Sequence, residues 1–211
     1  MKRFGPRPVL LPPSRPVAAL FPKGDVMESE FSAVIDFWFR ELTPRQWFTE
    51  GGPRLDDRVR TRFGNLVEAA RRGVLDHWAR SPRGRLALII LLDQFPRHCF
   101  RGMPEAYASD AKAQALAAEG IAAHMDEQLT FAERQFFYMP LMHAEDRDLQ
   151  ALSLERFDAL REAAEAVLGF ASGHRKIVYR FGRFPHRNKV LGRASSPQEE
   201  AFLASDENTF R

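Results

Sequence analysis

Helical periodicity runs through most of this 211-residue sequence and limits the folds that it can adopt. From residue 29 onward, apolar residues recur at spacings of three and four, and no segment shows the strict alternation of a half-buried strand. Capping boxes open two of these segments, Thr130-Phe-Ala-Glu133 and Ser196-Pro-Gln-Glu199. Because the connections are short, the pattern predicts an all-α fold of about nine helices in antiparallel pairs.

Each expected helix has a recognisable start or stop signal. Pro96 should limit the most apolar helix, Pro140 should kink another, and Gly169 should end a long amphipathic one. No strict repeat of 34 or 40 residues is visible, so a regular solenoid is not indicated. The expected helices cover residues 29–41, 44–48, 56–72, 82–95, 110–118, 131–143, 148–168, 174–181 and 197–203.

The amino-terminal segment, residues 1–26, differs from the rest in composition. It contains six prolines and has no helical or strand period, which is typical of open, extended backbone. We expect either a disordered tail or an upstream start codon, with Met27 as the real beginning. Residues 27–211 should then form a single helical domain. The net charge of the whole chain is +3, and residues 1–26 contribute +4 to it. The remaining domain therefore carries −1, which argues against nucleic acid as a partner.

Several classes of protein are disfavoured by composition. Cys99 is the single cysteine, which fits a reducing compartment and excludes a zinc site built from several thiolates. The longest apolar run, at residues 86–92, is too short to cross a bilayer. There is no glycine-rich phosphate loop. We therefore expect a cytoplasmic protein that is not bound to a membrane, and no cofactor is indicated.

Polar residues continue the apolar stripes of three expected helices. Asp93 and Arg97 follow Leu86 and Ile90 at helical spacing, and His143 follows Phe136 and Met139 in the same way. His174 is in phase with Ile177 and Phe181. Charges on a core-facing stripe are costly unless they are paired or used. The pattern indicates either a polar pocket at helix ends or a buried salt-bridge network that fixes the helix register.

Residues 181–193, FGRFPHRNKVLGR, place unusual positive charge in a stiff, apolar segment. The segment LDQFPRH at residues 92–98 is similar, since each contains Phe-Pro near an arginine and a histidine. Both should be rigid turns that present basic groups. The natural partners of Asp93 are Arg97 on its own helix and the arginines of the later segment.

These motifs resemble a known family. VIDFWF, LALIILLDQFPRH, RGMPEAYASDAKA, FFYMPLMHAED and HRKIVYRFGRFPHRN occur in the order found in the bacterial family called domain of unknown function 924. The resemblance covers roughly residues 31–211 and implies a helical fold similar to tetratricopeptide-repeat proteins, with no established activity. The family's motif residues fall on Trp38, Trp47, Asp93, Gln94, Arg97, His143, Glu145, His174, Arg183, His186, Arg187 and Asn188. Two positions depart from the family pattern, His98 and Ala144.

Two kinds of function stay open. In the first, Arg97, Arg183 and Arg187 hold a small anion, because guanidinium groups match carboxylate and phosphate oxygens. His143, His174 or His186 then serves as general acid or base, oriented by Asp93 or Glu145, with Gln94 and Asn188 as further ligand contacts and Trp38 and Trp47 as walls. A metal on His143, Glu145, His174 and His186 lacks a supporting spacing. In the second, the chain is a helical module that binds a peptide or protein.

Overall fold

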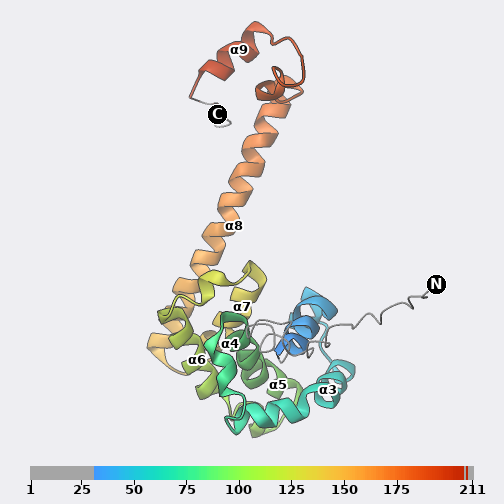
Figure 1. The fold of residues 1–211 in the computed structure, drawn as a ribbon, viewed down its shortest axis with the longest axis vertical. Coiled ribbons are helices and arrows are strands. Elements are labelled where there is room, and N and C mark those ends of the chain that lie inside the picture. Colours follow the sequence, from blue (N-terminus) through green and yellow to red (C-terminus); the bar gives the residue numbers. More distant parts are fainter. Residues whose placement is uncertain (1–30, 207, 209–211) are drawn as a thin grey trace, which may run out of the picture. The chain divides into compact units, whose positions relative to one another are not determined.

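The computed structural model describes residues 31–206 and 208, and the expectation for residues 1–26 lies outside them. Throughout this part of the chain the fold is all-α and contains no strand, as predicted (Figure 1). The chain divides into two compact units, with the boundary between Ser153 and Leu154. The expectation of one domain, and the likeness to tetratricopeptide repeats, stay predictions.

Three helices of the first unit begin at a capping side chain, whereas α3 (Pro53–Arg71) begins three residues before the predicted start at residue 56, which is wrong. The side chains of Thr43, Ser81 and Thr130 each accept a hydrogen bond from a backbone N–H in the first turn of the helix that follows. Residues 31–36 are helical and lead into the π-helix η2 (Phe37–Glu41). The further elements are α2 (Pro44–Phe48), α3 (Pro53–Arg71), η3 (Asp76–Arg80), α4 (Pro82–Ile89), η4 (Ile90–Gln94), α5 (Phe95–Cys99), η5 (Pro104–Ala106), α6 (Asp110–Ala122), η6 (Asp126–Gln128), α7 (Phe131–Met142) and the start of α8 (Arg147–Phe181).

The core of the first unit surrounds the segment Leu86 to Leu92, whose residues are all fully buried. The helices α4 and η4 contact α3, α6 and α7, so apolar side chains are required on every face of this segment. An aromatic cluster adjoins it, in which Trp38, Phe95 and Phe136 are also fully buried. Burial on all sides explains why this is the most apolar stretch of the sequence.

Pro96 does not end the helix that precedes it, which corrects the prediction. The backbone widens into the π-helix η4, in which the N–H of Phe95 donates to the carbonyl of Ile90, and α5 then continues with Pro96 in its first turn. A proline lacks the N–H that a continuous α-helix would need and crowds the preceding turn. A π-turn directly before it relieves both problems, and such turns are frequent at functional sites.

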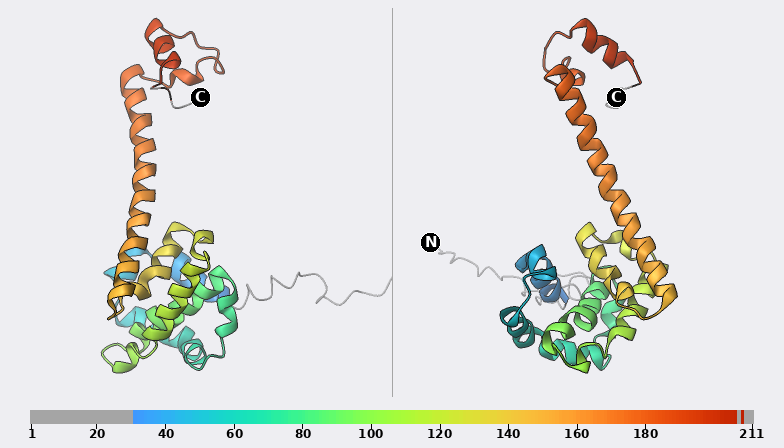
Figure 2. Two further views of the ribbon diagram at one scale, coloured as in Figure 1. Left: turned by 90° about the vertical axis from the view of Figure 1, so that its left-hand side faces the viewer. Right: turned by 180° about the vertical axis from the view of Figure 1, so that it is seen from behind.

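The second unit contains the rest of α8, the short helix η7 (Pro185–Arg187) and α9 (Pro197–Ala204). The expected break at Gly169 is wrong, because one helix runs from Arg147 to Phe181 (Figure 2). Gly169 does not have a positive φ, whereas Gly182 has φ of +69° directly after the helix. A glycine that terminates a helix commonly adopts the left-handed conformation, and the sequence does not reveal which of several glycines adopts it.

Candidate functional site

A buried carboxylate is the centre of the candidate site. Asp93 lies in η4, and its side chain is 0% exposed among aliphatic neighbours. An ionised carboxylate in such surroundings is tolerated only if its oxygens accept hydrogen bonds or face a positive charge. The contacts of Asp93 therefore decide what the site is.

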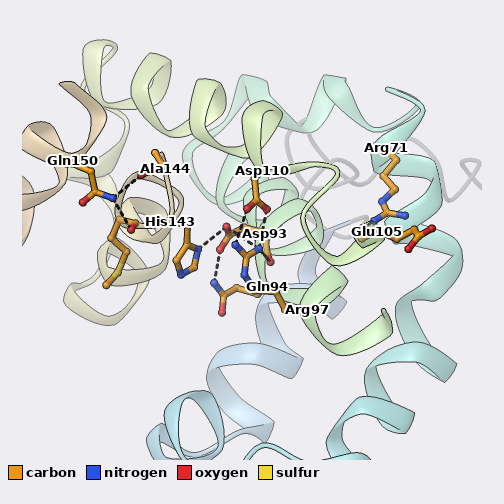
Figure 3. A network of polar contacts seen from close by, with 10 residues as sticks. Arg71, Asp93, Gln94, Arg97, Glu105, Asp110, His143, Ala144 and Gln150 are labelled. Carbon is orange, nitrogen blue, oxygen red and sulfur yellow. Dashed lines mark hydrogen bonds and ion pairs between the residues drawn. The ribbon is translucent and has the colours of Figure 1, made fainter. Parts of the chain in front are cut away.

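Three side chains satisfy the carboxylate of Asp93 (Figure 3). The Nδ1 of His143 lies 2.9 Å from Oδ1, and the side-chain amide of Gln94 donates to Oδ2. The Nη1 of Arg97 lies 3.3 Å from Oδ1. Asp93, Arg97 and His143 were predicted to continue apolar stripes, and the fold brings these three together.

Arg97 is held by a second carboxylate as well. Its guanidinium donates to both oxygens of Asp110, at 3.0 and 2.8 Å, and to the backbone carbonyl of Asp93. Its charged carbon lies 5.4 Å from the centre of the Tyr107 ring. The guanidinium thus has its charge offset by two carboxylates, and it links η4 to the first turn of α6.

His143 follows the last residue of α7, and its side chain is 25% exposed. Because Nδ1 contacts Asp93, the second ring nitrogen, Nε2, is the one left for other partners, and it forms no hydrogen bond with the residues that the structure describes. The loop after His143 is fixed by Gln150, whose amide donates to the carbonyls of Met142 and Ala144 (Figure 3). The imidazole is therefore oriented by Asp93, which contacts its ring, and by Gln150, which fixes the backbone on either side of His143.

An open cavity of about 670 Å³ adjoins these groups. A cavity of this size suits a small molecule. Among its charged lining residues, three are carboxylates and one is a guanidinium. Its walls are formed by Arg97, Tyr107, Asp110, Ala111, Gln114, His143, Glu145 and Asp146. Of the predicted site residues, Arg97, His143 and Glu145 line this cavity, and Asp93 lies directly behind His143.

The two predicted tryptophan walls lie elsewhere. Trp38 is fully buried in the aromatic core of the first unit, between Phe95 and Phe136. The indole N–H of Trp47 donates to the backbone carbonyl of Trp38 at 2.7 Å. Neither residue lines the cavity, because both indole rings pack against Phe136 in the aromatic cluster. Their role in the described structure is packing.

The basic segment at 183–188 belongs to the second unit and has partners there. Arg183 donates to both oxygens of Glu199, at 2.6 and 2.7 Å, and the buried Asn188 amide contacts Ser195 and Glu199. The guanidinium of Arg187 stacks 4.4 Å from the Phe184 ring. The positive charge is thus balanced in part by α9, which the sequence analysis did not predict as a partner.

The two histidines of the second unit lie near the same ring. The centre of the Phe184 ring is 5.7 Å from the ring of His174 and 5.5 Å from the ring of His186. His174 also contacts the carbonyl of Phe170 through Nδ1, at 2.7 Å. Partial burial lowers the pKa of His186, and Arg187 and His174 add to that effect. These contacts describe a packed turn.

The pair Arg183–Glu199 predicts acid sensitivity in α9. Hydrogen bonds from Arg183 and from the backbone of Ser196 lower the pKa of Glu199 from 4.5 to about 2. Because the pKa of Glu199 is lower in the folded state than in the unfolded state, its ionised form stabilises the fold fully above pH 4.5. This stabilisation is lost as the pH falls from 4.5 towards 2. We therefore expect hydrogen exchange in α9 to accelerate at pH 3 relative to pH 6, after correction for intrinsic rates. In Glu199→Gln the protection should already be reduced at pH 6 and should change less; equal pH responses would contradict this account.

A second buried Asp–His pair was not anticipated. His98 Nδ1 lies 2.7 Å from Oδ1 of Asp56, and Arg101 donates to both oxygens of that carboxylate. Burial lowers the pKa of His98. Burial also opposes ionisation of Asp56, but the hydrogen bonds from Arg101 and His98 outweigh it and lower the pKa of that carboxyl. His98 is one of the two departures from the family pattern, and it thus has a hydrogen-bonding partner, Asp56, on α3.

Asp110, Tyr107 and Gln114 line the cavity, and the sequence analysis missed all three. Asp110 was interpreted only as the start of a helix. The motif RGMPEAYASDAKA contains Tyr107 and Asp110, and this was the one available signal. Among the residues that the structure describes, no group of three or more His, Cys, Asp or Glu could hold a metal ion.

The comparisons identify relatives without a known activity. The family model described as "Bacterial protein of unknown function (DUF924)" matches residues 34–207. A solved structure of a protein of unknown function from Agrobacterium tumefaciens, ATU0120, is 38% identical, with a TM-score of 0.59 over 84% of this chain and 98% of that one. No curated protein matches the sequence. In the described part of the chain, no helix has both the length and the apolar character that a membrane crossing requires.

Proposed function

Since the chain belongs to the DUF924 family of bacterial proteins, whose function is unknown, we propose a function from the site itself: Asp93 and His143 form a general base for a small molecule bound in the adjoining cavity. The observation that carries this proposal is the 2.9 Å contact between a fully buried carboxylate and the Nδ1 of a partly exposed imidazole. A purely structural pair would not need the imidazole to line an open cavity.

The proposed chemistry is proton transfer at Nε2 of His143. The carboxylate of Asp93 accepts the Nδ1–H, which selects the tautomer that carries a lone pair on Nε2. That lone pair takes a proton from water or from a hydroxyl or amine of the ligand. Asp93 then stabilises the imidazolium that forms, and the same proton is returned later in the reaction. Gln94 and Arg97 keep Asp93 in place for this role.

The lining favours a neutral or cationic ligand over the anion expected from the sequence. Among the described residues of the lining, Arg97 carries the one guanidinium, and Asp93 and Asp110 already offset its charge. The carboxylates of Asp110, Glu145 and Asp146 face the same cavity. Arg183 is bound by Glu199 in the second unit. A ligand with an amine or several hydroxyl groups would complement this set, whereas a phosphate would meet net repulsion.

A thermal-shift screen of matched cationic, neutral and anionic metabolites tests both parts of the proposal. Amines or polyols should stabilise the wild type, and His143→Gln should keep most of this shift, because the carboxylates that complement the ligand are unchanged. Among stabilising compounds that contain a hydrolysable bond, His143→Gln should lower turnover by about 10²- to 10⁴-fold.

His124→Gln is the matched control, because His124 is exposed and lies at the end of α6, away from the cavity lining. It should keep both the thermal shift and the turnover of the wild type. Stabilisation by anions alone would refute the proposed ligand class. Turnover that survives in His143→Gln would refute the general base.

A further inference from the structure

The middle of α8 is exposed on every side. All twelve residues from 161 to 172 are exposed, and they include Val167 (67%), Leu168 (65%) and Phe170 (71%). Three turns of helix without a packed face are rarely stable in water, because helices in proteins depend mainly on burial of an amphipathic face. Large apolar side chains exposed together mark an interaction surface.

Six of the exposed apolar residues lie on one face of α8, and Leu168 lies beside that face. Ala164, Val167, Ala171 and Val178 fit the alternating spacing of three and four residues that places side chains on one coiled-coil seam, with His174 between the last two. Ala163 and Phe170 flank that seam. We call the following residues the α8 stripe: Ala163, Ala164, Val167, Phe170, Ala171 and Val178. All six are exposed. The alanines would let a second helix approach closely.

The charge along this helix changes sign from one end to the other. Residues 155–165 contain four acidic and two basic side chains. Residues 166–181 contain three basic side chains, Arg175, Lys176 and Arg180, and no acidic one. Arg161 already pairs with Asp158 and Glu165 on its own helix. An antiparallel copy of the same helix would place the basic part of one beside the acidic part of the other, whereas a parallel copy would place like charges together.

We propose that a second copy of this chain covers the α8 stripe, so that two α8 helices pack antiparallel about a two-fold axis near Val167. Residue 164 then lies opposite residue 171 and Val178 lies level with Phe157 of the second copy, so the pairing extends over residues 157–178, which is about 33 Å of helix at 1.5 Å per residue. A two-fold interface uses the same patch on both subunits, so a single self-complementary stripe is sufficient. The charge pattern is the reason for choosing a second copy over an unrelated partner.

Sedimentation equilibrium of the full chain tests the proposal. The wild type should have twice the monomer mass of 24.1 kDa at micromolar concentration. Val167→Glu should be monomeric, because it places a charge at the centre of the stripe. Ser172→Glu is the matched control, since it adds the same charge to the exposed opposite side of α8 and should stay dimeric. Circular dichroism should show lower helicity in Val167→Glu than in Ser172→Glu, because the middle of α8 loses its packed face when the dimer is lost.

Cysteine cross-linking tests the orientation. In the antiparallel pair, residue 164 lies opposite residue 171 of the partner, so a mixture of Ala164→Cys and Ala171→Cys should form a disulfide-linked dimer. Ala164→Cys alone should not, because its two sulfur-bearing residues would be about 10 Å apart along the helix. Wild-type protein controls for the native Cys99, which is buried.

Three results would overturn the proposal. A wild type that is monomeric at 100 micromolar would mean that the stripe is covered in another way, for example by the same chain or by an anionic vesicle that the monomer binds. A dimer that persists in Val167→Glu would place the interface elsewhere. Self-linking of Ala164→Cys would show a parallel pair, in conflict with the charge argument.

Discussion

Replacing Asp93 by alanine should lower the free energy of unfolding by about 3–5 kcal/mol, the usual effect of removing one partner from a buried ion pair. Asp93 is fully buried, and its loss would leave His143, Gln94 and Arg97 beside a space without an acceptor. Urea unfolding followed by far-UV circular dichroism would measure the change.

Asp57→Ala is the control for this prediction. Asp57 pairs with Arg60 at 2.9 Å, but both side chains are more than half exposed, so its removal should cost about 0–1 kcal/mol. Asp93→Asn, which keeps an acceptor for His143, should fall between the two. If Asp93→Ala were as stable as Asp57→Ala, the polar network would not be needed for folding, and the burial of Asp93 would have to be explained by function alone.

Phe136→Ala should destabilise the first unit by a similar amount, about 3–5 kcal/mol, because it removes a large buried ring and leaves a cavity. Phe136 is fully buried on α7, and its ring contacts those of Trp38, Trp47 and Phe48, at centroid distances of 5.3, 5.0 and 6.0 Å. These rings cannot all relax into the space, since each has further partners. Denaturant unfolding monitored by tryptophan fluorescence would report the change directly.

Phe131→Ala serves as the matched control on the same helix. Phe131 is 48% exposed in the first turn of α7, so its truncation should cost under about 1 kcal/mol. Equal losses in the two variants would mean that helix propensity, and not the aromatic cluster, determines the effect. A small loss in both would show that the cluster around Trp38 contributes less than its burial implies.

The secondary structure was largely readable from local rules. The capping boxes at Thr130 and Ser196 both form, and the all-α class follows from periodicity without a strand pattern. These signals act within one or two turns, so they are present in the sequence itself. The breaks at Pro96 and Gly169 were wrong, because a π-turn accommodates the proline and tertiary context leaves the glycine helical.

The candidate site was predictable in part. Placing Asp93, Arg97 and His143 on apolar stripes required only helical spacing, but the choice of partner required the fold. Asp110 lies 13 residues beyond Arg97 and Glu199 lies 16 residues beyond Arg183, and no spacing rule connects either pair. The cavity beside His143 accordingly contains three carboxylates, of which only Glu145 was a predicted site residue.

Sequence alone sufficed for the helical class, the two capping boxes and the polar residues that interrupt apolar faces, because each depends on neighbours within a few positions. Tertiary structure alone decided that His143 meets Asp93, that Arg183 meets Glu199, and that α8 continues through Gly169. Such pairings depend on how whole helices pack, which is set by the sum of many weak contacts between distant residues. No local pattern encodes that sum.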